Sequence, residues 1–282
     1  MYAIAGDWTG RLRDTVESAL LRSFVREQTF LRCRGRKEGT IMTATEQFLQ
    51  MINESDNIVF FGGAGVSTES GIPDFRSVDG LYHQKYDHPP ETILSHSFYL
   101  RNTEEFYRFY REKMLCLDAK PNITHQKLAA LEQAGKVKAV ITQNIDGLHQ
   151  KAGSRKVLEL HGSVHRNYCR KCRKAFDTEY VLSSVEQIPR CDKCGGEIKP
   201  DVVLYEEGLD QQTLEDAVFY ISHADVLIVG GTSLAVYPAA GLIDYYRGNK
   251  LVLINKTTTP MDGQVDLLLQ AGLGEIFSQI EG

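Results

Sequence analysis

The sequence lacks the features of several specialised protein classes. No apolar run approaches the roughly 18 to 20 residues that a membrane-spanning helix requires. The N-terminus lacks the apolar core and small-residue cleavage site of a secretory signal. With 24 Gly and 8 Pro among 282 residues and no fixed-period repeat, collagen-like and low-complexity architectures are excluded. We therefore expect a soluble, cytoplasmic globular protein with no membrane partner.

The sequence also lacks an excess of positive charge. Its formal net charge of -5 and pI near 5.9 argue against a nucleic-acid binder, which usually carries a basic patch, but leave basic peptides as partners. Residues 1–41 hold eight Lys and Arg against five Asp and Glu, whereas residues 42–282 hold 24 against 32, a balance of -8. We expect 1–41 to be a loosely ordered leader or an over-extended start. The folded unit should begin near Met42, where Thr43 and Glu46 form a capping box.

From Asp56 onward, strand-like and helix-like stretches alternate, which predicts an α/β fold with a largely parallel sheet. The predicted strands are Asn57–Phe61, Lys138–Thr142, Val157–Leu160, Val202–Tyr205, Asp225–Val229 and Lys250–Ile254. The predicted helices are Thr103–Cys116, Thr124–Ala134, Gln211–Ser222 and Ala239–Tyr246. Two stretches interrupt the alternation, at 77–123 and 165–200, and these are predicted inserts.

Four cysteines predict a metal site in the second insert. Cys169-x-x-Cys172 and Cys191-x-x-Cys194 are separated by 18 residues, which is within the spacing of four-thiolate zinc sites. Four protein ligands leave no open position, so the Zn²⁺ would be structural. The alternatives are two disulfides or free thiols, and a cytosolic setting disfavours the disulfides. Cys33 and Cys116 stand alone and are assigned no role.

A glycine-rich run, Phe61-Gly62-Gly63-Ala64-Gly65-Val66-Ser67, directly follows the first predicted strand. Such glycines allow a tight turn and a close approach to phosphate, and a following helix N-terminus would add partial positive charge. As a dinucleotide fingerprint the run is imperfect, because the third glycine position is Thr68 and no acidic residue ends a second strand about twenty residues on. The run alone predicts either a phosphate loop or only a tight turn.

Further motifs indicate whether the glycine-rich run is a phosphate loop or only a tight turn. They are the run 63–76, which ends in Gly71-Ile72-Pro73-Asp74-Phe75-Arg76; the run 142–149, Thr-Gln-Asn-Ile-Asp-Gly-Leu-His; His161-Gly162; the cysteine pairs; Gly231-Thr232-Ser233-Leu234; Val236-Tyr237-Pro238; and Leu253-Ile254-Asn255. In this order they closely resemble the sirtuin family of NAD-dependent protein lysine deacylases. The resemblance runs from about residue 42 to the C-terminus.

The resemblance implies a Rossmann-like parallel-sheet domain plus a smaller zinc-ribbon and helical domain formed by the two inserts. NAD and an acetylated protein lysine would meet in the cleft between them. Residues implied at the phosphates and nicotinamide ribose are Ala64, Thr68, Phe75 and Arg76. Those implied for the nicotinamide pocket are Ile72, Asp74, Ile145 and Asp146. Gln143 and Asn144 would hold the ribose and a water; Thr232, Ser233, Asn255, Lys256, Leu273 and Gly274 would face the adenosine half.

The resemblance also implies the chemistry, with His161 and Asn144 as the catalytic residues. The acyl-lysine oxygen attacks the ribose as nicotinamide leaves, and His161 takes a proton from a ribose hydroxyl. The products are free lysine, nicotinamide and O-acyl-ADP-ribose. The alternatives are a mono-ADP-ribosyltransferase, which would capture cleaved NAD with a protein nucleophile, a non-catalytic acyl-lysine reader, and a dehydrogenase, which the broken fingerprint disfavours.

At two places the sequence departs from motifs of the family, and both departures bear on which substrate is preferred. Relatives that prefer acidic acyl groups carry Tyr-x-x-Arg, but here Tyr107 is followed by Arg111 one residue late, which turns the guanidinium by about 100° on a helix. We therefore predict a preference for acetyl over succinyl groups. Where the family usually reads Phe-Gly-Glu, this chain has Tyr205-Glu206-Glu207. These added carboxylates predict a preference for acetyl-lysine in a basic context, unless they form only a solvated loop.

Overall fold

The computed structural model describes residues 42–76, 80–81 and 86–281, and our predictions for 1–41 lie outside these ranges. A compact unit begins at Met42. The expected capping box is present: Thr43 Oγ1 accepts a hydrogen bond from the Glu46 amide at 3.2 Å, and Glu46 Oε2 accepts one from the Thr43 amide at 2.7 Å. The box starts helix α2 (Ala44–Glu54), which buries Phe48 and Ile52.

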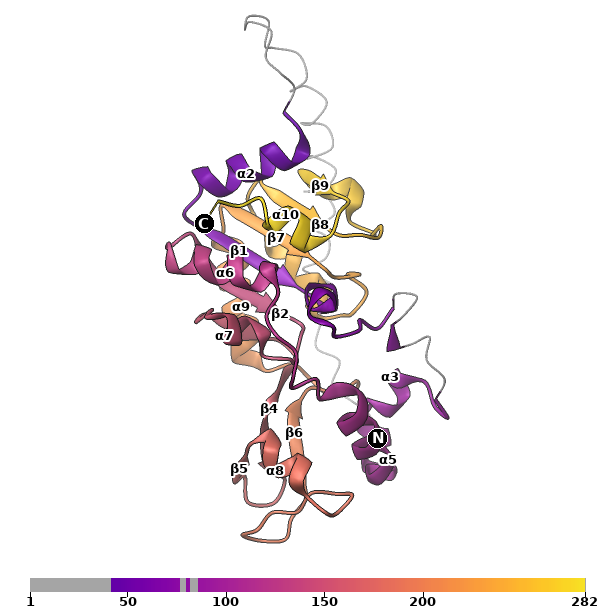
Figure 1. Ribbon diagram of the computed structural model, residues 1–282. Coiled ribbons are helices and arrows are strands. Elements are labelled where there is room, and N and C mark those ends of the chain that lie inside the picture. Colours follow the sequence, from indigo (N-terminus) through magenta and orange to yellow (C-terminus); the bar gives the residue numbers. More distant parts are fainter. Residues whose placement is uncertain (1–41, 77–79, 82–85, 282) are drawn as a thin grey trace, which may run out of the picture. The chain divides into compact units, whose positions relative to one another are not determined.

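The main sheet is parallel and has six strands. These are β1 (Ile58–Gly62), β2 (Val137–Thr142), β3 (Val157–Glu159), β7 (Val226–Gly230), β8 (Leu251–Ile254) and β9 (Leu267–Leu269). Their order in space is β3-β2-β1-β7-β8-β9 (Figure 1). The chain therefore builds the sheet outward from β1 in one direction and later in the other, as in a Rossmann domain. Ligands of such sheets bind where the order reverses, here between β1 and β7, beside the carboxyl ends of the strands.

Every residue of β1 is buried, because both faces of the sheet are covered. Ile58 and Phe60 lie in a core with α2, α6 (Ile123–Gln133) and α10 (Leu273–Phe277). Val59 and Phe61 lie in a second core with α9 (Gln211–His223) and the 3₁₀ helix η5 (Ala239–Tyr245). Since successive strand residues point to opposite faces, a doubly covered strand needs a continuous apolar run.

A smaller antiparallel sheet has the order β5-β4-β6. Its strands are β4 (Gly162–Cys169), β5 (Ala175–Phe176) and β6 (Ile198–Val202), with α8 (Thr178–Ser183) between β5 and β6. Helices α3 (Pro90–Ile93), α4 (His96–Arg101) and α5 (Thr103–Phe109) come from the earlier insert. Their aromatic side chains, including Tyr99 and Tyr107, share one core with Ile198 and Cys169 of the small sheet. The two stretches that interrupt the strand-helix alternation thus bury apolar surface together.

Three predicted elements differ in the structure. The helix predicted over Thr103–Cys116 is an α-helix only to Phe109 and continues as a π-helical turn, η4 (Tyr110–Met114). The helix predicted at Ala239–Tyr246 is 3₁₀. The strand predicted at Val202–Tyr205 is wrong: β6 ends at Val202, because β4 pairs with residues Ile198–Val202, and Tyr205 instead forms an isolated bridge with Ser95.

Candidate active site

The glycine-rich loop after β1 closes onto the turn after β7. The helical segments that follow the loop are two 3₁₀ turns, η1 (Ala64–Val66) and η2 (Thr68–Ser70). The Gly65 amide donates to the Gly231 carbonyl oxygen at 2.8 Å, and a Cβ at Gly65 would lie 2.8 Å from Gly231 Cα. Glycine is therefore required at position 65 by the close approach of these two backbones.

Ser67, which sequence reasoning missed, orders two predicted site residues. Its buried hydroxyl donates to Asp146 Oδ2 at 2.6 Å and accepts from Asn144 Nδ2 at 3.0 Å. Asp146 Oδ1 also accepts from the Leu148 amide at 2.9 Å, at the start of α7 (Leu148–Ala152). The side chains of Asn144 and Asp146 are thus held in place. The available signal was a polar residue just after a buried strand, since buried hydroxyls need partners.

His161 has the hydrogen bonding of a neutral base. Its Nδ1 lies 2.9 Å from the Gln143 carbonyl oxygen. Because a carbonyl oxygen only accepts, Nδ1 carries the proton, and the neutral ring presents an unprotonated Nε2. Burial lowers the pKa of His161 below its usual 6.5, outweighing the opposite effect of the bond to Gln143. His161 is therefore ready to accept a proton at neutral pH.

Side chains after β1, β2 and β7 are joined by hydrogen bonds. Gln143 Nε2 donates to Thr232 Oγ1 at 3.1 Å. Arg76 Nη1 donates to Ser233 Oγ at 3.3 Å. The structure thus brings predicted site residues together at the edge where the strand order reverses. Arg76 and Ser233, for example, lie more than a hundred positions apart in the sequence.

The other predicted residues of the nicotinamide half lie on the same loops. Ala64, Thr68, Ile72, Asp74, Phe75 and Ile145 are all partly exposed. Thr68 Oγ1 donates to the Gly65 carbonyl oxygen at 3.0 Å, and Asp74 Oδ1 accepts from the Arg76 amide at 3.0 Å. Partial exposure beside tightly packed glycines leaves these side chains accessible to a ligand.

Of the residues predicted at the adenosine half, Thr232 and Ser233 follow β7, and the other four lie after β8 and β9. Asn255 Nδ2 donates to the Thr257 carbonyl oxygen at 2.9 Å, and Lys256 is exposed. Leu273 is buried in the core, and the Gly274 amide donates to Glu69 Oε1 at 3.2 Å. Leu273 and Gly274 therefore offer less to a ligand than Asn255 and Lys256, and Glu69 joins this group unpredicted.

The four predicted metal ligands converge. The sulfur atoms of Cys169, Cys172, Cys191 and Cys194 all lie within 4.8 Å of one another. The Cys169–Cys194 and Cys172–Cys191 sulfurs are 3.4 and 3.7 Å apart. These separations exclude disulfides, whose sulfurs lie about 2.05 Å apart. They fit a tetrahedron of thiolates about 2.3 Å from a central Zn²⁺. The Cys172 amide donates to the Cys169 sulfur and is the main cause that lowers the pKa of this thiol to about 6, which favours the metal-binding thiolate.

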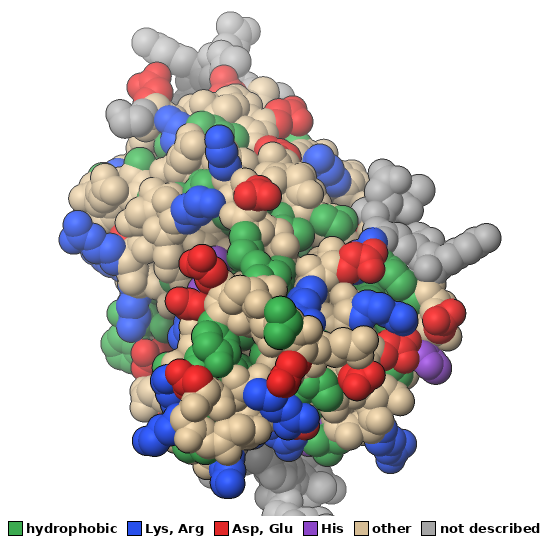
Figure 2. Space-filling view, turned by 60° about the horizontal axis from the view of Figure 1, so that its bottom comes forward, with side chains coloured by type: hydrophobic (Ala, Val, Ile, Leu, Met, Phe, Trp, Pro, Cys, Tyr) green, Lys and Arg blue, Asp and Glu red, His purple; other side chains and the backbone are tan. Residues whose placement is uncertain are grey.

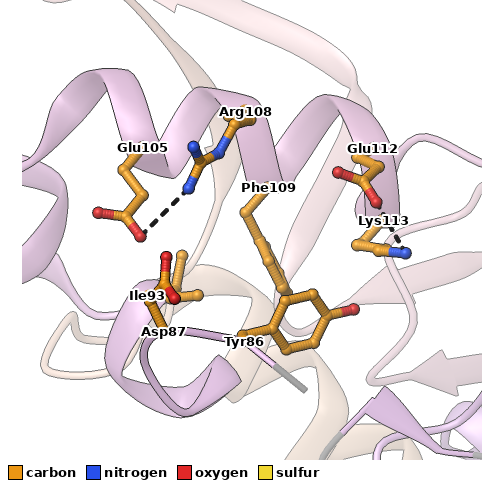
Figure 3. A pocket seen from close by; sticks show the side chains of 8 residues that line it. All are labelled: Tyr86, Asp87, Ile93, Glu105, Arg108, Phe109, Glu112 and Lys113. Atoms are coloured by element: carbon orange, nitrogen blue, oxygen red, sulfur yellow. Dashed lines mark hydrogen bonds and ion pairs between the residues drawn. The ribbon is translucent and has the colours of Figure 1, made fainter. Parts of the chain in front are cut away.

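A cavity of about 550 Å³ lies apart from these loops, against α5 and η4 (Figure 3). Tyr86, Ile93 and Phe109 form its apolar part. The charged residues at its rim pair with each other: Arg108 with Glu105 at 3.5 Å, and Lys113 with Glu112 at 2.9 Å. None of its lining residues was predicted to bind a ligand, and we assign the cavity no role.

Comparison with known proteins agrees with this geometry. Residues 63–238 match the model of the Sir2 family. The NAD-dependent protein deacetylase of Clostridium acetobutylicum is 58% identical over 242 residues, covering 85% of this chain and 99% of that protein. The NAD-dependent protein deacetylase of Cutibacterium acnes is 53% identical over 238 residues, covering 84% and 97%.

Solved structures are also similar. A Sir2 protein with deacetylated p53 peptide and 3'-O-acetyl-ADP-ribose has a TM-score of 0.78 and 42% sequence identity, covering 84% of this chain and 96% of that one. Sir2 with a p53 peptide and NAD⁺ has a TM-score of 0.75 and 43% identity, covering 85% and 97%. With the family model matching residues 63–238 and these identities over most of both chains, the chain belongs to the Sir2 family.

Proposed function

We propose that the chain is an NAD-dependent protein lysine deacetylase that transfers the acetyl group of acetyl-lysine to ADP-ribose. The observation that carries this proposal is His161, whose Nδ1 is fixed on the Gln143 carbonyl oxygen so that Nε2 can accept a proton. The names of the relatives, and the peptide, NAD⁺ and acetyl-ADP-ribose held by similar Sir2 structures, support the substrates. Because the acetyl group is transferred, the enzyme would be a transferase.

Each residue of the candidate site would have a separate role in the reaction. NAD would supply the ribose that receives the acetyl group. His161 Nε2 would accept the proton of a ribose hydroxyl as general base. Asn144, held by Ser67, would orient the ribose or a water. Asp146 keeps acceptor capacity beyond its bonds to Ser67 and Leu148 and would accept a hydrogen bond from the nicotinamide carboxamide.

The four cysteines would hold Zn²⁺ in a purely structural role, because they leave no position for a reacting ligand. Zn²⁺ would fix the small sheet, which with helices α3–α5 would form the smaller domain. No helix in residues 42–76, 80–81 and 86–281 is long and apolar enough to cross a membrane. We propose the cytoplasm as the location, since a cluster of free cysteines suits a reducing compartment.

We also propose that neutral acyl groups are preferred over acidic ones. The Arg111 guanidinium donates to the carbonyl oxygens of Val181, Glu186 and Gln187 at 2.8 to 3.2 Å. Both terminal nitrogens of Arg111 are therefore engaged by carbonyl oxygens in and after α8, and its Nε is buried, so the guanidinium is not directed at a succinyl carboxylate. The Tyr107 hydroxyl is likewise used, since it donates to the Ile198 carbonyl oxygen.

A preference for acetyl-lysine in a basic context is the remaining part of the proposal. The Glu207 carboxylate already pairs with Lys199 at 3.1 Å and contacts His96 Nδ1 at 2.7 Å, so it is engaged within the protein. Glu206 is exposed and would attract Lys or Arg beside the acetyl-lysine. On the face shown in Figure 2, basic and acidic side chains are interspersed, so such a preference would be local.

The test is incubation of the protein with NAD and acetyl- or succinyl-lysine peptides, followed by mass spectrometry of all products. We expect free peptide, nicotinamide and O-acetyl-ADP-ribose in equal amounts, with slower turnover of the succinyl peptide. His161→Ala should lower the rate at least about 100-fold. The control is His223→Ala, because His223 is exposed at the end of α9.

Other products would contradict the proposal. A peptide that gains ADP-ribose and keeps its acetyl group would identify an ADP-ribosyltransferase. Unchanged peptide and NAD, with the peptide still bound, would identify a reader.

A further inference from the structure

Glu206 adopts a backbone conformation that normally favours glycine. Its φ is 76°, in the left-handed region where a Cβ is strained. The chain therefore places a glutamate in a backbone conformation that is strained for any residue with a Cβ. A compensating interaction is therefore expected from the Glu206 side chain.

The compensating contact is with the first turn of α4. Glu206 Oε2 accepts from the Ser97 amide at 2.8 Å, and Oε1 accepts from the Ser97 hydroxyl at 3.0 Å. Both carboxylate oxygens are thus used on one residue of the helical insert. Glycine at position 206 could make neither bond.

The neighbouring residues tie the same two segments together. Glu207 Oε1 lies 2.7 Å from His96 Nδ1, and Glu207 Oε2 accepts from the Leu204 amide at 2.8 Å. The Tyr205 amide donates to the Leu94 carbonyl oxygen at 3.0 Å, and the His96 amide donates to the Tyr205 carbonyl oxygen at 2.9 Å. Main-chain and side-chain bonds therefore fix residues 204–207 against α4.

Glu206 itself keeps its backbone available. Among the described residues, no backbone hydrogen bond joins the Glu206 N–H or C=O to another main-chain group, and the residue is exposed. A peptide strand binds an exposed main-chain edge through such groups, and its register depends on where that edge is held. The side-chain contacts with Ser97 therefore leave free the Glu206 backbone groups that a peptide strand would need.

We propose that Glu206, Glu207, His96 and Ser97 form a clamp that holds residues 204–207 so that their main chain can pair with the acetyl-lysine peptide, next to His161, whose carbonyl oxygen accepts from the Val203 amide at 3.0 Å. These are positioning residues: they act through the backbone of 204–207 and not on the reacting atoms. The inference rests on the proposed deacetylase function. It assigns to Glu206 a structural contribution that is independent of its charge.

Steady-state kinetics with Glu206→Gly and Glu206→Gln separate the contribution of the clamp from the contribution of the Glu206 charge. Two acetyl-lysine peptides are used, one with neutral and one with basic flanking residues. Glu206→Gly relieves the backbone strain but removes the clamp, so the KM for both peptides should rise on the order of tenfold. The kcat and the KM for NAD should stay within about twofold, because the reacting groups are not touched. Glu215→Gln, an exposed change on α9, is the control.

Glu206→Gln is the conservative rescue. Its amide oxygen still accepts from the Ser97 amide, so the KM for the neutral peptide should return close to that of the unchanged protein, while any preference for the basic peptide is lost. An unchanged neutral-peptide KM in Glu206→Gly would overturn the clamp, as would equal KM increases in both variants. If the unchanged protein deacetylates neither peptide, it is the proposed function that fails.

Discussion

At the scale of single residues, two buried histidines lie close to the candidate site. The rings of His125 on α6 and His149 on α7 are 4.7 Å apart. In the described part of the chain, three of the ring nitrogens have no hydrogen-bond partner: both nitrogens of His149 and Nε2 of His125. Burial lowers the pKa of His125 to about 4 and, together with the neighbouring His125, the pKa of His149 to about 3. Both rings are therefore neutral in the folded protein at pH 7.

This burial predicts acid sensitivity of the fold. Below pH 6.5 the unfolded chain protonates both histidines, whereas the folded chain does so only near pH 4 and pH 3. The stability is therefore complete above pH 6.5 and falls as the pH drops. Urea unfolding at pH 7 and pH 5 should show that His149→Leu reduces this loss by about 2 kcal/mol. His223→Leu, at an exposed site, is the control. Equal losses in His149→Leu and the unchanged protein would contradict the assignment.

At the scale of elements, the start of β4 depends on one glycine. Gly162 follows His161 and pairs with Val202 of β6. Its φ is 76°, and a Cβ there would overlap the Asp201 carbonyl oxygen. Both the backbone conformation and the space therefore require glycine.

Gly135 offers a matched comparison. Its φ is 77°, but a Cβ there would meet nothing within 4 Å. Gly135→Ala should cost about 1 kcal/mol of unfolding free energy, from backbone strain alone. Gly162→Ala should cost at least about 3 kcal/mol, because overlap is added to strain. Urea titrations of both variants measure the difference. Similar costs would mean that β6 moves away without penalty.

Elements differed in how far the sequence could predict them. β1 was predictable because five consecutive buried residues form a parallel strand covered on both faces. β4 was missed because its polar and apolar residues follow no simple alternation, and its partner β6 lies beyond the cysteine pairs. β9 has only three residues, too few for a pattern. Arg111 was placed from α-helical geometry, but it lies in the π-helical turn η4 with its guanidinium 5.5 Å from the centre of the Tyr107 ring, so the preference for neutral acyl groups stays a prediction.

The residues of the candidate site also differed in how far the sequence could identify them. Motif residues such as His161 and Asp146 could be singled out because their chemistry and order are specific, and their roles remain predictions. Ser67 and Glu69 were missed because their roles depend on contacts with Asp146 and Gly274, which are distant in the sequence. The substituted Glu206 was noticed as added charge, but its bonds to Ser97 could not be predicted without the fold.

At the scale of the whole molecule, the described residues form three hydrophobic cores, and the metal site belongs to one of them. Cys169 and Cys191 are buried with the aromatic residues of α4 and α5, whereas the two cores that cover the main sheet include none of the four cysteines. Removing Zn²⁺ should therefore loosen the small sheet and helices α3–α5 and leave the main sheet folded.

Chelation followed by hydrogen exchange tests this. We expect one zinc per chain, faster exchange in β4 and β6, loss of deacetylation, and unchanged protection in β1 and β7. Added Zn²⁺ should restore both protection and activity. Equal loss of protection in β1 and β4 would show that the cores unfold as one.

The contact between Gly65 and Gly231 also bears on how the protein is made. During synthesis, β1, β2 and the entire small sheet are made before residue 231 is added. The nascent chain then holds a half-sheet whose central strand, β1, still lacks its neighbour β7. Pairing across so many residues is slow, and the exposed edge of β1 is open to wrong partners until β7 arrives. The pairing of β7 with β1 therefore both completes the active edge and covers the exposed edge of β1.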